Sequence, residues 1–282
     1  MRVVHTKQQL RKALKELRSA GGSVGLVPTM GYLHEGHISL IRRARQENDV
    51  VVVSVFVNPA QFGPNEDLNA YPRDTQGDLK LMQGEKTDLA FLPRAEELYP
   101  DGYATYVELN GRMTQVLCGV SRPGHFRGVA TVVTKLFNIV SPDRAYFGQK
   151  DAQQVSVIKK MVRDLDFNIT IVACPTVREA DGLAMSSRNS YLTAAQRAQA
   201  PVIARALFEA RDRITAGERC SASLVDLIKE RITTIDNATL DYVSIIDADD
   251  MSDIETIIGP TLIAVAVKLG RTRLIDNIRI EV

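Results

Sequence analysis

The sequence predicts an α/β fold: a Rossmann-like, doubly wound parallel sheet followed by a smaller C-terminal α+β domain. Three observations predict it. Before about residue 180, short β-branched apolar runs alternate with stretches of helical period, the pattern of a parallel sheet covered by helices. The run at 50–57 is apolar almost throughout, as in a strand that is covered on both faces. Beyond about residue 180, two helical stretches precede three strand-like runs, which indicates a separate small domain.

The elements of the first domain follow from local signals along the chain. Leucines recur at helical spacing in residues 6–19 after a Thr6 cap, and Gly21 and Gly22 predict the end of that helix. A short apolar strand is expected at 24–27. Further strands are predicted at 50–57, 89–92, 144–147 and 168–172, and helices at 38–47, 129–140 and 155–162.

The C-terminal part of the chain is predicted to hold helices first and a strand hairpin last. Helices are expected near 194–216 and 222–235, and strands at 241–247, 261–268 and 272–280. The last two strands flank Leu269-Gly270-Arg271, which is a hairpin signal. The change of pattern predicts a domain boundary within 174–190.

Composition argues against several classes of protein. Lys and Arg total 35 against 34 Asp and Glu, a formal net charge of +1, whereas bulk nucleic-acid binding usually shows as a basic surplus. Three distant cysteines without a CxxC pair predict neither a disulfide framework nor a cysteine zinc site, so a reducing cytoplasm fits. Residues 1–15 lack the apolar stretch of a signal peptide, and the 50–57 run is too short to span a bilayer.

The first motif that carries chemistry is PTMGYLHEGH at 28–37, which joins a predicted strand to a predicted helix. Free N–H groups and the helix dipole favour anions there, and Gly31 and Gly36 permit a tight turn. His34 and His37 are neighbours on one helical face, so they can donate to a triphosphate. Two other interpretations stay open: a zinc site, although HExxH spacing and a third ligand are missing, or two surface histidines.

The second motif is MSSRN at 185–189, on a loop after the fifth predicted strand. Two hydroxyls and a guanidinium suit phosphate oxygens, although by itself this could be any solvated loop. Together the two motifs resemble the HIGH and KMSKS signatures of the adenylyl-transferring superfamily. The first lysine of KMSKS is Ala184 here and the second is replaced by Ser187-Arg188, so Arg188 would supply the charge. No Walker A or GxGxxG sequence competes with this interpretation.

Three further segments narrow the resemblance: VNPAQF at 57–62, RPGHFRG at 122–128 and YFGQKDAQQ at 146–154. Alone, each could be a turn, a helix cap or a core aromatic pair. In this order, PTMGxLHEGH, FVNPxQF, RPGHFxGV, YFGxKDxQQ and MSSRN resemble the pantothenate synthetase (pantoate–β-alanine ligase) family. The resemblance covers essentially the whole chain.

That resemblance implies an ATP- and magnesium-dependent condensation of pantoate with β-alanine. The pantoate carboxylate would attack the α-phosphorus of ATP, pyrophosphate would leave, and the amine would attack the adenylate and release AMP. No enzyme nucleophile is needed, so catalysis would be positioning and electrostatic stabilisation. The resemblance also implies a homodimer, an ATP- and pantoate-binding domain at 1–176, and a C-terminal domain at 177–282 that covers the site.

The resemblance assigns site residues by motif. The catalytic contacts to ATP and its phosphates would be His34, His37, Lys150, Ser186, Ser187 and Arg188. The other ATP-binding residues would be Met30, Gly36, Gly148, Asp151, Val177 and Met185. Pantoate would be held by Gln61 and Gln154, with Met30 packing beside them.

Two assignments are left with alternatives. The resemblance implies that the acidic segment 71–78 can present a magnesium-side acid, and Asp78 is the candidate. Magnesium is usually held through phosphates plus one or two carboxylates. The alternative is an acidic residue early in an amphipathic helix. Arg122 and His125 either line the site or serve the structure only.

Two other functions compete with this one. A nucleotidylyltransferase that moves AMP onto a phosphate acceptor would share HxGH, but it would need neither the paired glutamines nor residues 180–282. A nucleotide-binding regulatory module without turnover would not need the dense set of phosphate donors, Lys150 in particular.

Overall fold

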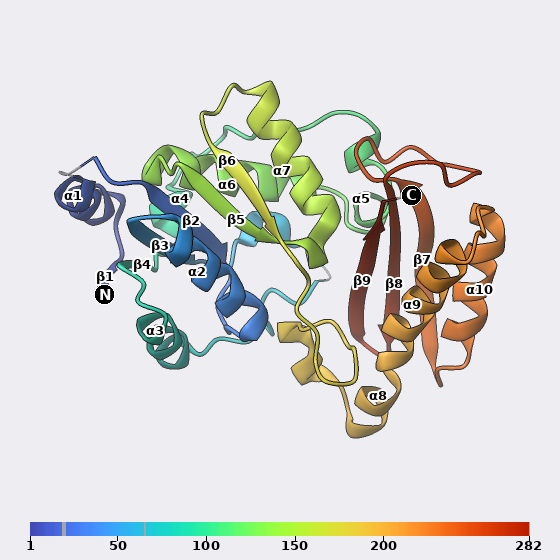
Figure 1. Ribbon diagram of the computed structural model, residues 1–282. Coiled ribbons are helices and arrows are strands. Elements are labelled where there is room, and N and C mark those ends of the chain that lie inside the picture. Colours follow the sequence, from blue (N-terminus) through green and yellow to red (C-terminus); the bar gives the residue numbers. More distant parts are fainter. Residues whose placement is uncertain (19–20, 65, 282) are drawn as a thin grey trace. The chain divides into compact units, whose positions relative to one another are not determined.

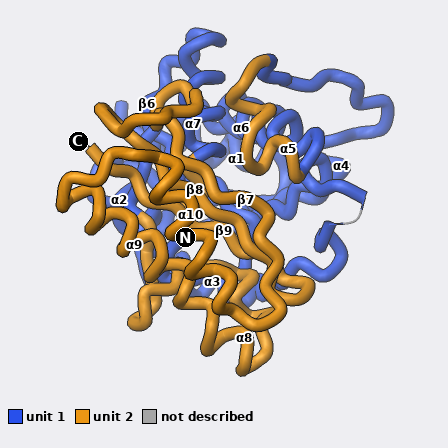
Figure 2. The backbone as a smooth tube through the Cα atoms, turned by 90° about the vertical axis from the view of Figure 1, so that its right-hand side faces the viewer, with its two compact units in different colours: residues 1–110, 122–149, 153–175 blue, residues 111–121, 150–152, 176–282 orange. Residues whose placement is uncertain are grey.

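The computed structural model describes residues 1–18, 21–64 and 66–281. Its contacts divide the chain into two compact units, coloured separately in Figure 2. Unit 1 comprises 1–110, 122–149 and 153–175, and unit 2 comprises 111–121, 150–152 and 176–282. The predicted α/β fold class is confirmed. The division into functional domains at 1–176 and 177–282 concerns what each part binds, and it stays a prediction.

Unit 1 is built on a six-stranded parallel sheet in the order β1-β4-β3-β2-β5-β6 (Figure 1). The strands are β1 (Arg2–Val4), β2 (Val24–Thr29), β3 (Val50–Val55), β4 (Leu89–Phe91), β5 (Arg144–Gly148) and β6 (Thr170–Cys174). The winding reverses between β2 and β5, because β3 and β4 continue from β2 in one direction and β5 and β6 lie on the other side. The fold is therefore doubly wound, as predicted.

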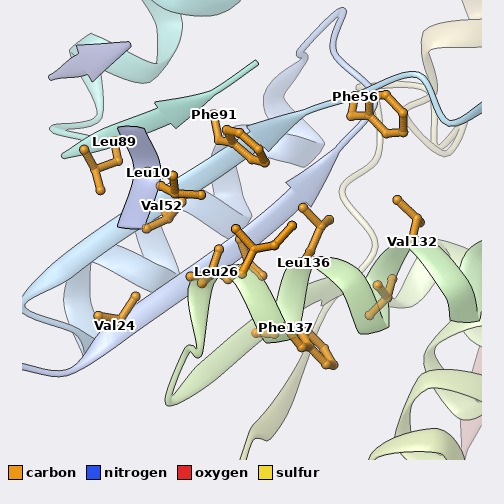
Figure 3. Close-up of a cluster of buried hydrophobic side chains, with 14 of the residues drawn as sticks. Leu10, Val24, Leu26, Val52, Phe56, Leu89, Phe91, Val132, Leu136 and Phe137 are labelled. Carbon is orange, nitrogen blue, oxygen red and sulfur yellow. The ribbon is translucent and has the colours of Figure 1, made fainter. Parts of the chain in front are cut away.

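Alternate residues of these strands pack into two different cores. Val52 and Leu26 belong to the core under α1 (Lys7–Leu17), α6 (His125–Val140) and α7 (Ala152–Asp164). Figure 3 shows this core, with Leu136 and Phe137 of α6 opposite the strand side chains. Val51 and Val53 pack instead under α2 (Glu35–Glu47) and α3 (Thr75–Gly84). Burial on both faces explains why β3 is apolar almost throughout.

Local signals set the ends of the first helices. Thr6 caps α1 with a capping box, which confirms the predicted start. The helix is described as far as Leu17; residue 19, the end of the predicted helix, lies outside the described residues. β1 was not predicted, because a three-residue edge strand carries too short a pattern to be recognised in the sequence.

Unit 2 is built on a three-stranded antiparallel sheet of β7 (Ala238–Asp247), β8 (Thr261–Leu269) and β9 (Thr272–Ile280). The two-residue turn between β8 and β9 is the predicted hairpin, with Gly270 at φ 60°. α9 (Pro201–Thr215) and α10 (Ser221–Thr233) cover one face. The other face packs against side chains from segments 111–121 and 150–152, so these two segments belong to unit 2.

The helix expected over 194–216 is two helices, α8 (Ala194–Gln199) and α9, which begins at Pro201. Proline has no N–H and its ring disfavours a continuous helix, so the prediction of one helix was wrong at this position. The remaining short elements are α4 (Ala95–Leu98), α5 (Cys118–Ser121) and the 3-10 helices η2 (Pro59–Gln61), η3 (Arg112–Thr114), η4 (Gln149–Asp151) and η5 (Ser187–Tyr191). None of the helices in the described ranges has the length and apolar character needed to cross a membrane.

Candidate functional site

The carboxyl ends of three neighbouring strands of unit 1 lead into predicted site residues. Residues 30–37 follow β2, Gln61 follows β3, and Gln154 lies in the first turn of α7 after β5. β2 and β5 pair only at Gly25–Arg144 and Leu26–Ala145, so the two strands diverge toward their carboxyl ends. Ligands of open α/β sheets bind at such a topological switch point, and the predicted residues of unit 1 therefore share one edge of the sheet.

The HxGH turn forms the start of α2. His34 is the N-cap, and its Nδ1 accepts the Gly36 N–H at 3.2 Å. The His34 N–H in turn donates to His37 Nδ1 at 3.4 Å, and the two ring centroids lie 4.1 Å apart. Since both Nδ1 atoms accept, the hydrogen of each neutral ring is on Nε2. Two N–H donors at a helix N-terminus are suited to an anion such as a triphosphate.

Asp78 fixes the turn that precedes this helix. Its carboxylate accepts the Leu33 N–H at 2.7 Å and the Tyr32 N–H at 3.0 Å. Tyr32 has φ 52° and Gly31 has φ 82°, both left-handed, a conformation that a non-glycine residue such as Tyr32 seldom adopts. A Cβ at Gly31 would lie 2.9 Å from the Asp78 carboxylate. Burial raises the pKa of Asp78, and the two backbone N–H groups act in the opposite direction.

A magnesium ion at Asp78 was predicted from the sequence, and it stays a prediction. Asp78 is buried and two of its lone pairs already accept backbone N–H groups, although a carboxylate offers about four acceptor positions. The described part of the chain contains no group of three or more His, Cys, Asp or Glu side chains that could hold a metal ion. The residues therefore fit an ion held mainly by nucleotide phosphates rather than by a cage of side chains.

Gln61 ends the short helix η2 and is buried. Its side-chain oxygen accepts from Asn58 Nδ2 at 3.1 Å, and its Nε2 lies 3.1 Å from Met30 Sδ. The structure thus brings together Gln61 and Met30, two of the three residues expected to bind pantoate. The third, Gln154, is half-buried on α7. Asn58 was quoted within its motif but received no role from the sequence.

In unit 2, the MSSRN loop follows a short hairpin of residues 177–185. The Met185 N–H donates to the Val177 carbonyl oxygen at 3.0 Å, so these two predicted ATP-binding residues are paired. Ser186 Oγ accepts the Arg188 N–H at 3.3 Å and caps η5. Asn189 Nδ2 donates to Glu179 at 2.8 Å. The loop therefore holds Ser186, Ser187 and Arg188 in consecutive positions of one defined turn.

Two buried residues of β9 bond to the segments of unit 2 that carry predicted phosphate contacts: Asp276 to the hairpin before the MSSRN loop, and Asn277 to Lys150. Arg178 donates to both carboxylate oxygens of Asp276, at 2.6 and 2.9 Å. Asn277 Nδ2 donates to the Lys150 carbonyl oxygen at 2.8 Å. Neither Asp276 nor Asn277 was predicted as functional; the available signal was a pair of adjacent polar residues between the apolar Ile275 and Ile278. Gly148 ends β5, and Asp151 is exposed on η4.

Comparisons with known proteins agree with the motifs. A family model described as pantoate-beta-alanine ligase matches residues 2–279. A pantothenate synthetase of Acetivibrio thermocellus is 55% identical over 282 residues, which is 100% of both chains. A crystal structure of pantothenate synthetase from Thermus thermophilus has a TM-score of 0.94 at 47% identity and 99% coverage of each chain. A pantoate-beta-alanine ligase from Francisella tularensis, complexed with beta-gamma ATP and beta-alanine, has a TM-score of 0.80 at 37% identity and covers 99% and 97%.

Proposed function

We propose a function from one premise: the chain belongs to the pantoate-β-alanine ligase family. It is an ATP-dependent ligase that condenses pantoate with β-alanine through a pantoyl-adenylate and releases AMP and pyrophosphate. The observation that carries this function is the match over the whole length of both proteins to relatives named for that activity. The residues of the site agree with this function, because the motifs supply groups that donate hydrogen bonds to anions, and uncharged amides, instead of a nucleophile.

In the first step, pantoate is held so that its carboxylate reaches the α-phosphorus of ATP. Gln61 and Gln154 bind its hydroxyls and carboxylate by hydrogen bonds, and uncharged amides do so without adding a charge that would weaken the nucleophile. Met30 packs against Gln61. Holding two reactants in the right geometry is itself a large part of the rate enhancement.

The phosphate contacts stabilise the charge that develops as pyrophosphate leaves. His34 and His37 donate from the start of α2, and the cation of Lys150 and the donors of Ser186, Ser187 and Arg188 act on the same phosphates. Gly36, Gly148, Asp151, Val177 and Met185 contact the rest of ATP. Magnesium, when bound with ATP, neutralises phosphate charge, with Asp78 as its proposed protein contact.

In the second step, the amine of β-alanine attacks the adenylate carbonyl, the C–O bond to AMP breaks, and the amide forms. Residues 1–176 bind ATP and pantoate in this proposal, and residues 177–282 cover the site. The enzyme acts in the cytoplasm as a homodimer. The absence of a disulfide framework among three cysteines supports that compartment, and a mass measurement in solution tests the dimer.

Product analysis tests the function directly. The protein is incubated with ATP, Mg²⁺, pantoate and β-alanine, and pantothenate, AMP and pyrophosphate are quantified. We expect the three products in equal amounts, and none of them when pantoate is omitted. ADP in place of AMP, or AMP transfer onto a phosphate ester, would contradict the proposal.

A further inference from the structure

Residues 122–128 contact the main chain of the turn that carries Gln61. His125 Nδ1 lies 2.9 Å from the Gln61 carbonyl oxygen, and Arg122 Nη2 donates to the same oxygen at 3.3 Å. His125 and Gln61 are both buried. Two side chains therefore hold the backbone of a proposed substrate-binding residue from one direction.

The hydrogen-bond pattern fixes the protonation of His125. Arg122 Nη1 lies 3.0 Å from His125 Nε2, and a guanidinium can only donate. Nε2 therefore accepts and carries no hydrogen. The ring is neutral with its hydrogen on Nδ1, which donates to the Gln61 carbonyl oxygen.

Glu66 fixes Arg122 in turn. Arg122 donates through Nε and Nη2 to the two oxygens of Glu66 at 2.7 and 2.6 Å. Burial would raise the pKa of Glu66, but the hydrogen bonds and charge of Arg122 hold this pKa below its usual value. The bidentate geometry restrains the guanidinium plane. A series of hydrogen bonds therefore runs from Glu66 through Arg122 and His125 to the Gln61 carbonyl oxygen.

The side chain of Gln61 is oriented from the other direction by Asn58. Asn58 Nδ2 donates to the Gln61 side-chain oxygen and to the Gly128 carbonyl oxygen, each at 3.1 Å, and Tyr99 donates to Asn58 Oδ1 at 2.8 Å. A Cβ at Gly128 would lie 2.2 Å from the Ala60 carbonyl oxygen, so α6 approaches this turn as closely as only glycine permits.

The Gln61 amide keeps hydrogen-bonding capacity for a substrate. Its contacts to Asn58 and Met30 use one acceptor position and one hydrogen. The amide can therefore still donate one hydrogen bond and accept one.

We propose that Arg122 and His125 are positioning residues that set the enzyme's affinity for pantoate by holding Gln61. This inference rests on the proposed function, in which Gln61 binds pantoate. The effect passes through the Gln61 main chain, so neither Arg122 nor His125 has to touch the substrate.

The first test compares His125→Leu with His125→Asn by steady-state kinetics at saturating β-alanine. Leucine removes the donor, whereas the asparagine amide can place an N–H near the position of Nδ1. We expect His125→Leu to raise KM for pantoate about 10- to 100-fold, because a small misplacement of a positioning group has an effect of this size, and to leave KM for ATP nearly unchanged. We expect His125→Asn to recover most of the loss. The matched control is His5→Leu, because His5 Nδ1 makes a similar 2.9 Å contact to the Leu92 carbonyl oxygen outside the Gln61 network.

A double-mutant cycle with Gln61→Ala separates positioning from a general loss of structure. If His125 acts through Gln61, His125→Leu adds little to the pantoate KM of Gln61→Ala. The inference would be overturned if the two substitutions raised the pantoate KM independently, so that their separate factors multiplied in the double variant. It would also be overturned if His125→Leu raised the KM values of pantoate and ATP equally. If His125→Leu does not fold, Arg122→Lys serves in its place, because lysine keeps the positive charge but lacks the several N–H donors by which the guanidinium bonds to Glu66, His125 and Gln61. A wild-type protein without pantoate-dependent turnover would overturn the proposed function and this inference together; the other outcomes bear on the inference alone.

Discussion

Gln61 offers an uncharged amide to the proposed pantoate site, and its role can be separated from that of the phosphate contacts. Gln61→Ala removes the amide but leaves His34, His37 and Lys150 in place. We therefore expect the KM for pantoate to rise more than the KM for ATP. Steady-state kinetics with each substrate varied in turn measures both values. Gln83→Ala, at an exposed position of α3, is the control, and equal effects on both substrates would contradict the pantoate role.

The phosphate contacts make a different prediction at the residue scale. His34→Ala or Lys150→Ala should slow adenylation roughly 10²–10³-fold, because each removes one preorganised donor that stabilises developing charge. Single-turnover formation of the adenylate without β-alanine measures this step. Near-normal turnover in both variants would exclude the proposed phosphate site.

Asp78 has a structural role that can be tested without any substrate. In Asp78→Asn, one half-buried backbone N–H of the 31–33 turn faces an amide NH₂ in place of an acceptor, which costs about 1–3 kcal/mol. We expect a lower Tm in thermal unfolding without Mg²⁺ or ATP. An unchanged Tm would contradict this role. A higher Mg²⁺ requirement for turnover in the same variant would support the separate prediction of a metal contact.

The sequence was most informative at single residues within short motifs. It predicted the histidine pair at a helix start, because a strand, a glycine turn and an apolar helical stripe are local signals. It could not predict the bonds from Asp78 to Tyr32 and Leu33, which join positions 46 and 45 residues apart. For the same reason, Glu66 carried no signal of its pairing with Arg122.

At the scale of elements, the close packing of α6 on η2 depends on Gly128. A Cβ there would lie 2.2 Å from the Ala60 carbonyl oxygen and 2.6 Å from Gln61 Cα. We expect Gly128→Ala to lower the free energy of unfolding by about 1–3 kcal/mol through overpacking, measured by denaturant titration. Gly84→Ala is the matched control, because a Cβ at this helical glycine meets no atom within 4 Å. It should change stability by less than about 1 kcal/mol; a similar loss in both variants would contradict the packing argument.

Element boundaries followed the local signals where those signals were strong. Thr6 caps α1 as predicted, and the hairpin at Gly270 joins β8 to β9 as predicted. The end of α8 before Pro201 was not predicted, since the apolar helical pattern continues across this position. The contribution of segments 111–121 and 150–152 to unit 2 could not be predicted, because it depends on side chains such as Leu117 and Ala152 packing against a sheet far along the chain.

At the scale of the whole molecule, the order of the strands determines which motifs of unit 1 lie close together. Because β2 lies beside β5 and β3 continues on the other side, motifs that are far apart in the sequence share one sheet edge in unit 1. Alternating strands and helices predicted the fold class, but the strand order itself depends on long-range pairing. The family followed from five motifs in a fixed order, and it is confirmed by a match over residues 2–279.

Isotope exchange between pyrophosphate and ATP is the measurement that tests the central claim most directly. It is run with and without pantoate, in the absence of β-alanine, with Mg²⁺ present. Reversible formation of a pantoyl-adenylate predicts exchange that appears only when pantoate is added. No exchange from correctly folded protein, or exchange that does not depend on pantoate, would contradict the proposed reaction or its acid substrate.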